Sequence, residues 1–283
     1  MRTRISDKNI MPVFDLENEY KKIRALCFNK DAFGAYTMSG VARTRLHISY
    51  DDLLNYFFLD WPLRGSFTSI EEMLFSLAIS EDDFEKEVTE ERLLDFIQFT
   101  INAVRFLDRV VKSGKYTFYT ATSSVGKAIL ENCCFVAQKL GTEIKEEKNE
   151  IYLVYKDDIA TAVCNEIPET EASITEYQKI DSRGDLTRKM EILCSLAKRL
   201  EPFEKVLSSN GYKSLCTDTT FLLNKVARHE LNNNYSVDKM FINMDDKTKE
   251  LWCDRAFHMF LGCMAILPYI DIKKEIEKIK RAD

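Results

Sequence analysis

The sequence predicts a mainly α-helical protein, a multi-helix bundle with one small β-hairpin near residues 142–155. The chain has only 9 glycines and 5 prolines among its 283 residues, about 5% together against about 12% in average proteins. Charged residues make up 30% of the chain and hydrophobic residues 45%, a mixture typical of amphipathic helices. Apolar residues also recur at helical spacing along most of the chain.

In the first half of the chain, the apolar spacing and the helix-start signals define four helices and two segments without helix. Thr68, with Glu71 three residues later, predicts a capping box, and Thr89 predicts the N-cap of the longest of these helices. Residues 30–48 are expected to form a loop with one helical turn at most, and residues 116–120 a short extended segment. The helices are expected at residues 12–27, 51–59, 68–79 and 89–111.

In the second half, the β-hairpin is the main exception to the helical pattern, because polar residues 146–149 separate two β-prone runs. We expect the hairpin to pack on helices, since a lone hairpin is marginally stable. The last helix is apolar almost all round, which predicts a buried helix ended by Pro268 and followed by a solvated charged tail at residues 271–281. Helices are expected at residues 123–140, 157–167, 186–207 with a bend near Pro202, 217–229 and 247–267.

The sequence predicts two regions: residues 1–120, a helical region of unknown role, and residues 121–283, a helical region that contains the hairpin. A polar stretch from Pro168 to Gly184 is a further candidate boundary.

Charge and cysteine usage indicate a soluble cytoplasmic protein. The net charge is −6 and the isoelectric point about 5.4, so the whole molecule is not a polycation built to bind nucleic acid. The eight cysteines include no CxxC pair, which favours free thiols in a reducing compartment. No apolar run resembles a signal peptide or approaches the roughly 20 residues of a membrane span, so no membrane association is expected.

Several common active-site patterns are incomplete in this chain. Residues 116–130 contain a Gly-Lys pair, but Ala121 and Ala128 stand where a phosphate-binding loop needs glycine and a hydroxyl. No nucleotide cofactor, and no cofactor of any other kind, is therefore expected. His47 and His258 lack partners at metal-ligand spacing, which predicts no metal site. His258 is expected to be a buried core histidine.

One polar cluster is concentrated at the end of the predicted helix 217–229. Arg228 supplies fixed positive charge for a phosphate, and His229 titrates near neutral pH and can move a proton. Asn224 lies four residues before Arg228, on the same helix face, and Asn232 and Asn233 follow. Cleavage of RNA through its own 2′-hydroxyl needs a proton carrier and a cation. The alternative is a plain helix C-terminus, where Arg228 and His229 satisfy the last carbonyls.

The runs EIYLVYKDDIATAV, AKRLEPFEKVL and FLLNKVARHELNN resemble the helical C-terminal region of some bacterial abortive-infection proteins, which is related to the HEPN superfamily of helical ribonucleases. The resemblance covers about residues 130–270. In the HEPN ribonuclease signature several residues separate the arginine from the histidine, whereas here Arg228 directly precedes His229. The positions that match the family's LLN…RHNN-like run are Leu222, Leu223, Asn224, Arg228, His229, Asn232 and Asn233.

The resemblance implies a phage-defence or toxin-type protein that binds or cleaves RNA, with a homodimer as the expected assembly. In that hypothesis the protein is a metal-independent endoribonuclease. Arg228 and His229 are then catalytic, and Asn224, Asn232 and Asn233 bind the substrate. The competing hypothesis is a non-enzymatic helical interaction or scaffold protein.

Overall fold

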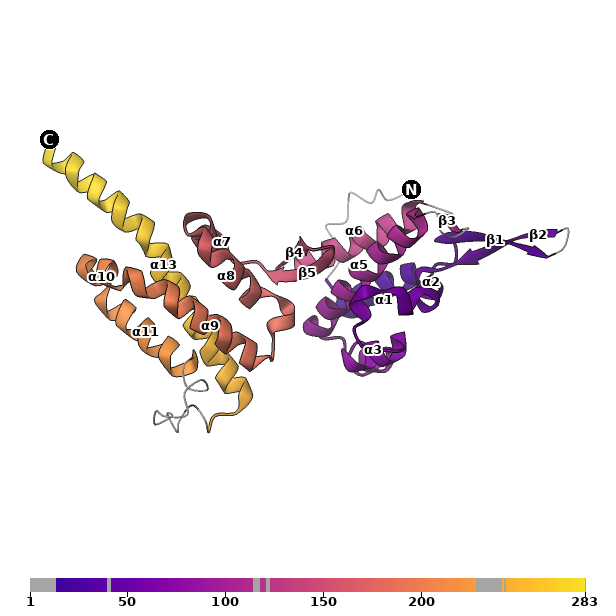
Figure 1. The fold of residues 1–283 in the computed structure, drawn as a ribbon, viewed down its shortest axis with the longest axis horizontal. Helices are drawn as coiled ribbons and strands as arrows, with labels where there is room; N and C mark the ends of the chain where they lie inside the picture. The colour runs from indigo at the N-terminus through magenta and orange to yellow at the C-terminus, as the bar shows by residue number, and fades with distance from the viewer. Residues whose placement is uncertain are drawn as a thin grey trace, which may run out of the picture. The chain divides into compact units, whose positions relative to one another are not determined.

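The structure is a computed structural model, and it divides the chain into two compact units, Met1–Leu153 and Val154–Asp283. Each unit is described by itself (Figure 1). The prediction of a mainly α-helical fold with a small hairpin near residues 142–155 is confirmed. The structure describes residues 14–39, 42–113, 118–120, 123–227, 241 and 243–282.

The first unit is organised around its longest helix, α5 (Glu90–Lys112), which contacts α1, α2 and α6. As predicted, Thr89 is its N-cap, and its side chain accepts a hydrogen bond from the Arg92 N–H. The apolar stripe of α5 is fully buried at Leu93, Leu94 and Ile97, so this helix forms the centre of the core. The other helices of the unit are α1 (Leu16–Cys27), α2 (Tyr50–Phe57), α3 (Ile70–Ser76), α4 (Glu81–Lys86) and α6 (Ser123–Lys139).

The helix α3 begins one residue later than the predicted capping box requires. Ser69 is its N-cap and accepts a hydrogen bond from the Glu72 N–H. Glu72 in turn accepts hydrogen bonds from the backbone N–H and the hydroxyl of Thr68, at 2.8 and 2.9 Å. The prediction of Thr68 with Glu71 was therefore wrong by one position, because both Thr68 and Ser69 can cap.

Residues 33–39 and 42–48 form two strands, so the prediction of a loop with one helical turn was wrong. Strands β1 (Phe33–Ser39) and β2 (Ala42–Ile48) pair antiparallel, and β3 (Phe118–Thr120) pairs with the other edge of β1. The strand β3 lies in the segment that was expected to be extended. Gly34 lies inside β1, where pairing on both sides overrides the weak strand propensity of a single glycine.

The predicted hairpin is formed by β4 (Thr142–Glu147) and β5 (Glu150–Tyr155). Lys148 and Asn149 make its turn with positive φ angles of 52° and 69°, the backbone conformation of a type I′ turn. The hairpin packs on a helix, as expected. The Asn102 side chain on α5 donates to the Ile151 carbonyl at 2.7 Å and accepts from the Ile151 N–H at 2.8 Å.

The division of the chain between Leu153 and Val154 differs from the expected one after residue 120. The helix α6 packs against α1 and α5, and β4 packs against α6. These contacts place residues 123–153 in the first unit. They join segments that are far apart in the sequence, and the composition of the chain does not reveal such contacts.

The second unit is a bundle in which α9 (Leu186–Leu200), α11 (Lys213–Ala227) and α13 (Asp246–Ala282) pack against one another. Its core includes Leu193 and Leu196 of α9, Leu223 of α11 and Phe260 of α13, all 0% exposed. The predicted bend at Pro202 is a 3-10 turn, Glu201–Phe203, which leads into α10 (Glu204–Leu207). The remaining helices are α7 (Asp158–Glu166) and α8 (Glu171–Gln178).

The polar stretch from Pro168 to Gly184 is part of the bundle and not a linker. It contains α8, and Thr170 and Ile174 are both 0% exposed. Thr170 is satisfied within its own turn, since its hydroxyl donates to the Ile167 carbonyl at 2.7 Å. The polar composition predicted a domain boundary here, but a few buried side chains hold this segment in the bundle.

The helix α13 continues through Pro268 to Ala282, so the expected helix end at this proline was wrong. A proline removes one helical hydrogen bond, but Ile270, two residues further on, is 1% exposed and fixes the next turn in the core. Residues 271–281 are exposed, in agreement with the predicted solvated helical tail.

Within the part of the chain that the structure describes, α13 is also the one helix with the length and composition of a membrane span. A core helix of a soluble protein passes the same test, and a single such helix is weak evidence for a membrane. One face of α13 is buried in the second unit at Cys253, Phe257, Phe260 and Met264, as in a core helix.

Candidate functional site

The structure describes one of the five predicted site residues. Asn224 is half-buried in the last turn of α11. Arg228, His229, Asn232 and Asn233 lie outside the described residues. The predicted pairing of Asn224 and Arg228 on one helix face therefore stays a prediction.

The helix that leads into the predicted site is firmly packed. Leu223 and Val226, on either side of Asn224, are 0% and 1% exposed. One turn earlier, Thr219 lies 3.3 Å from the Cys263 sulfur on α13. The last turn of α11 is thus anchored to the core, which gives the residues that follow a rigid starting point.

A buried lysine links three helices of the second unit. The Lys189 ammonium on α9 donates to Glu250 and Asp254 on α13, each at 2.8 Å. The Tyr177 hydroxyl on α8 donates to the same Asp254 carboxylate at 2.8 Å, and its ring stacks on Phe257. Burial alone would lower the pKa of Lys189, but the two carboxylates raise it above its usual value, so the side chain remains a cation. The paired charges therefore join the three helices.

His258 is exposed, so the expectation of a buried core histidine was wrong. Its side chain is 66% exposed, and its Nε2 lies 4.0 Å from the Asp157 carboxylate. Its Nδ1 lies 2.7 Å from the Asp254 carbonyl oxygen, one turn back on α13. The sequence around His258 is apolar, but α13 buries only one face and His258 stands on the other. Among the described residues, no group of three His, Cys, Asp or Glu side chains could hold a metal ion.

The Gly-Lys pair at Gly126 and Lys127 has a packing explanation. Gly126 lies inside α6, and a Cβ placed there would be 2.1 Å from the Tyr50 hydroxyl. That hydroxyl donates to Asp108 on α5 at 2.9 Å. The glycine therefore allows α2 to approach α6, which accounts for it without a phosphate.

The first unit contains a cavity of about 480 Å³ between α1, α2, α3 and α5, within the range of small-ligand sites. Its floor is made by α5, where Thr100, Ala103, Val104 and Leu107 are all buried. Aromatic and aliphatic side chains from the other helices complete the wall, among them Tyr20, Phe28, Leu54, Ile70, Leu74 and Phe75.

One cation and four carboxylates also line this cavity. Arg24 pairs with Glu81 at 2.6 Å and donates to the Tyr20 hydroxyl at 3.2 Å. Its guanidinium carbon lies 5.2 Å from the centre of the Phe28 ring, a cation–π distance. The carboxylates are those of Asp51, Glu71, Glu81 and Asp82.

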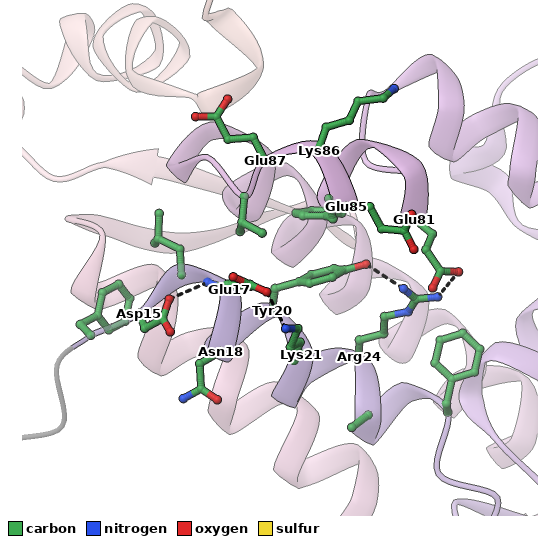
Figure 2. Close-up of a pocket in the computed structure, with 16 residues that line it drawn as sticks. Asp15, Glu17, Asn18, Tyr20, Lys21, Arg24, Glu81, Glu85, Lys86 and Glu87 are labelled. Atoms are coloured by element: carbon green, nitrogen blue, oxygen red, sulfur yellow. Dashed lines mark hydrogen bonds and ion pairs between the residues drawn. The ribbon is translucent and has the colours of Figure 1, made fainter.

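A neighbouring groove lies between α1 and α4, and Figure 2 shows the side chains that line it. Tyr20, Arg24, Phe28 and Glu81 line both the groove and the cavity. The Tyr20 ring stacks on Phe84, with centroids 3.8 Å apart, and its hydroxyl points to Arg24 in Figure 2. The Arg24–Glu81 ion pair therefore lines both the groove and the cavity.

The cysteine near this cavity is not an activated nucleophile. Burial raises the pKa of the Cys27 thiol to about 12, and the nearby Asp51 charge adds to the effect. Cys253 in the second unit also has its pKa raised to about 12 by burial. Both thiols are neutral near pH 7 and react slowly.

Sequence patterns did not reveal this cavity. Its walls come from short segments of four helices and the residues after α3, and no single segment has the spacing of a known motif. The available signal was the number of aromatic residues in the first half of the chain, which is equally typical of a core.

Comparisons of the chain with protein-family models, with curated proteins and with solved structures gave no match.

Proposed function

We propose that the second unit binds RNA at the end of α11 and cleaves it without a metal ion, as a phage-defence or toxin-type protein of the cytoplasm would. Arg228 holds the scissile phosphate, and His229 transfers the proton to or from the 2′-hydroxyl. Asn224, Asn232 and Asn233 orient the substrate. A homodimer, as the HEPN resemblance implies, would place two such sites in one assembly.

The observation that carries the proposal is the position of Asn224 in a helix that the core holds rigid. The helix α11 extends to Ala227, so the polar segment that begins at Arg228 directly follows a fixed element. Sites that start from rigid elements hold their geometry better than sites on free loops. The helical character of the second unit also agrees with the HEPN resemblance, which implies a helical domain.

The test is degradation of a mixed tRNA and mRNA pool by the purified full-length protein in the presence of a chelator. We expect cutting by the natural protein and a loss of about a hundredfold or more in His229→Ala, since a general acid–base contributes about that factor. Arg228→Ala should also abolish cutting, whereas Lys213→Ala, which removes one positive charge at the other end of α11, should leave it unchanged.

The competing candidate is a non-enzymatic helical interaction protein, favoured by the cavity in the first unit. It predicts that none of these proteins cuts RNA. Cutting that persists in His229→Ala, or that stops when the metal is chelated, would contradict the proposed mechanism.

A further inference from the structure

The cavity of the first unit is a built site that the proposed RNA chemistry does not use. It has a floor of buried α5 side chains and a volume of about 480 Å³. A cavity of this size lies in the range of sites that bind small organic ligands. Its lining is largely apolar and aromatic, with charged groups from α1, α2, α3 and the first turn of α4.

The charges that line the cavity favour a cation. One arginine and four carboxylates face it, which leaves a net charge of −3 near pH 7 from these groups. Burial raises the pKa of Asp51, and repulsion from Asp52 and Glu71 adds to the rise, whereas Arg24 and Lys30 act in the opposite direction. A bound cation would relieve this repulsion, whereas a bound anion would add to it.

Arg24 shows how a cation is accommodated at this position. Its guanidinium pairs with Glu81 and lies 5.2 and 5.9 Å from the centres of the Phe28 and Tyr20 rings. The same surroundings, aromatic faces with a carboxylate beside them, recognise organic ammonium ions. Arg24 satisfies Glu81, whereas the Asp51 carboxylate accepts a longer hydrogen bond from the Asn55 amide, at 3.4 Å.

We propose that this cavity binds a small organic cation, an amine carried on an aromatic or branched apolar body. The apolar body packs on Ala103, Val104 and Leu107 of α5. The ammonium group lies by the Asp51 carboxylate at the rim. The ligand is held without covalent chemistry, since the Cys27 thiol is neutral.

The experiment is calorimetric titration of the full-length protein with three probes of one shape and different charge. The probes are 2-phenylethylamine, 2-phenylethanol and 3-phenylpropanoate. We expect the amine to bind about tenfold more tightly than the alcohol, and the carboxylate to bind least. Equal or tighter binding of the carboxylate, or no binding of any probe, would overturn the proposal.

Two variants and a control locate the site. Asp51→Asn should weaken the amine about fivefold, as expected for one partly exposed ion pair, and leave the alcohol unchanged. Glu147→Gln, which removes a carboxylate from the hairpin of the same unit, should change neither. Ala103→Leu should weaken all three probes because it fills the floor, with circular dichroism to verify folding. An amine affinity that is the same in Asp51→Asn as in Glu147→Gln would place the binding elsewhere, whether or not Ala103→Leu folds.

Discussion

At the scale of single residues, the neighbours in the folded chain decide roles that the sequence left open or misassigned. Gly126 lies in a stretch that resembles a phosphate-binding loop, yet its lack of a Cβ leaves room for the Tyr50 hydroxyl. His258 resembled a core histidine, yet it is exposed beside Asp157. In both cases the sequence showed the residue type, and the neighbours that decide its role came from distant segments.

Substitution of Gly126 by alanine tests its packing role. We expect Gly126→Ala to lower the free energy of unfolding by about 1–3 kcal/mol, the usual effect of overpacking, because its Cβ would overlap the Tyr50 hydroxyl. Thermal unfolding followed by circular dichroism measures the change.

Two further variants control this result. Gly262→Ala, at a helical site with nothing within 4 Å of the added Cβ, should stabilise the protein by about 0.5–1 kcal/mol. In the Tyr50→Phe background the effect of Gly126→Ala should shrink, because the overlapping oxygen is gone. If Gly126→Ala and Gly262→Ala behave alike, the packing explanation is wrong.

At the scale of elements, side-chain amides on a helix complete the β4–β5 hairpin. Asn102 makes both hydrogen bonds to the backbone of Ile151, and Gln98 accepts from the Leu153 N–H at 2.7 Å. A strand edge needs such partners when it is buried. The helix α5 therefore supplies them in place of a third strand.

Removal of the Asn102 amide should destabilise the first unit. We expect Asn102→Ala to cost about 2–3 kcal/mol, since it leaves a buried N–H and a buried carbonyl of Ile151 without partners. Asn132→Ala is the matched control, because the Asn132 amide donates to the Ala128 carbonyl of its own helix, and it should cost less than about 1 kcal/mol. Urea unfolding measures both, and equal losses would contradict the account.

The contact of α9 with α13 should depend on pH through Glu250. Burial would raise the pKa of Glu250, but hydrogen bonds from the Gly184 N–H and the Lys189 ammonium lower it below its usual value. A carboxyl with a lowered pKa stabilises the fold above its ordinary pKa, and this contribution is lost as the pH falls through the lowered value.

We therefore expect the natural protein to lose more unfolding free energy than Glu250→Gln between about pH 5 and about pH 3. Near pH 7 the variant should be the less stable of the two. Urea titrations at these pH values measure the unfolding free energy of both proteins. If the two proteins lose the same free energy between these pH values, Glu250 does not cause the pH dependence.

At the scale of the whole molecule, the fold class was predictable and the division of the chain was not. Few glycines and prolines and strong helical spacing indicated the helices, and the N-cap at Thr89 marked the start of the longest helix of the first unit. The strands at residues 33–39 and 42–48 and the grouping of α6 with the first unit depend on contacts that local spacing does not show. Spacing along the chain does not carry that information.

Of the two candidate sites, likewise, one could be predicted from the sequence and the other could not. The RNA site was inferred from one continuous stretch, so its residues could be named from the sequence. The cavity draws side chains from α1, α2, α3, α4 and α5, so only the folded chain brings them together. The first unit thus holds a ligand-sized cavity and the second the predicted RNA site, and each can be tested by itself.

The central claim is that the chain contacts RNA at the end of α11, and the most direct measurement is the affinity of a fluorescently labelled single-stranded RNA. Fluorescence anisotropy should show binding by the natural protein and a loss of about tenfold in Arg228→Ala, the worth of one charged hydrogen bond to phosphate. Lys213→Ala, which changes the net charge equally at an exposed site, should bind as the natural protein does. Equal weakening by the two variants, or no binding by any of the three proteins, would contradict the claim.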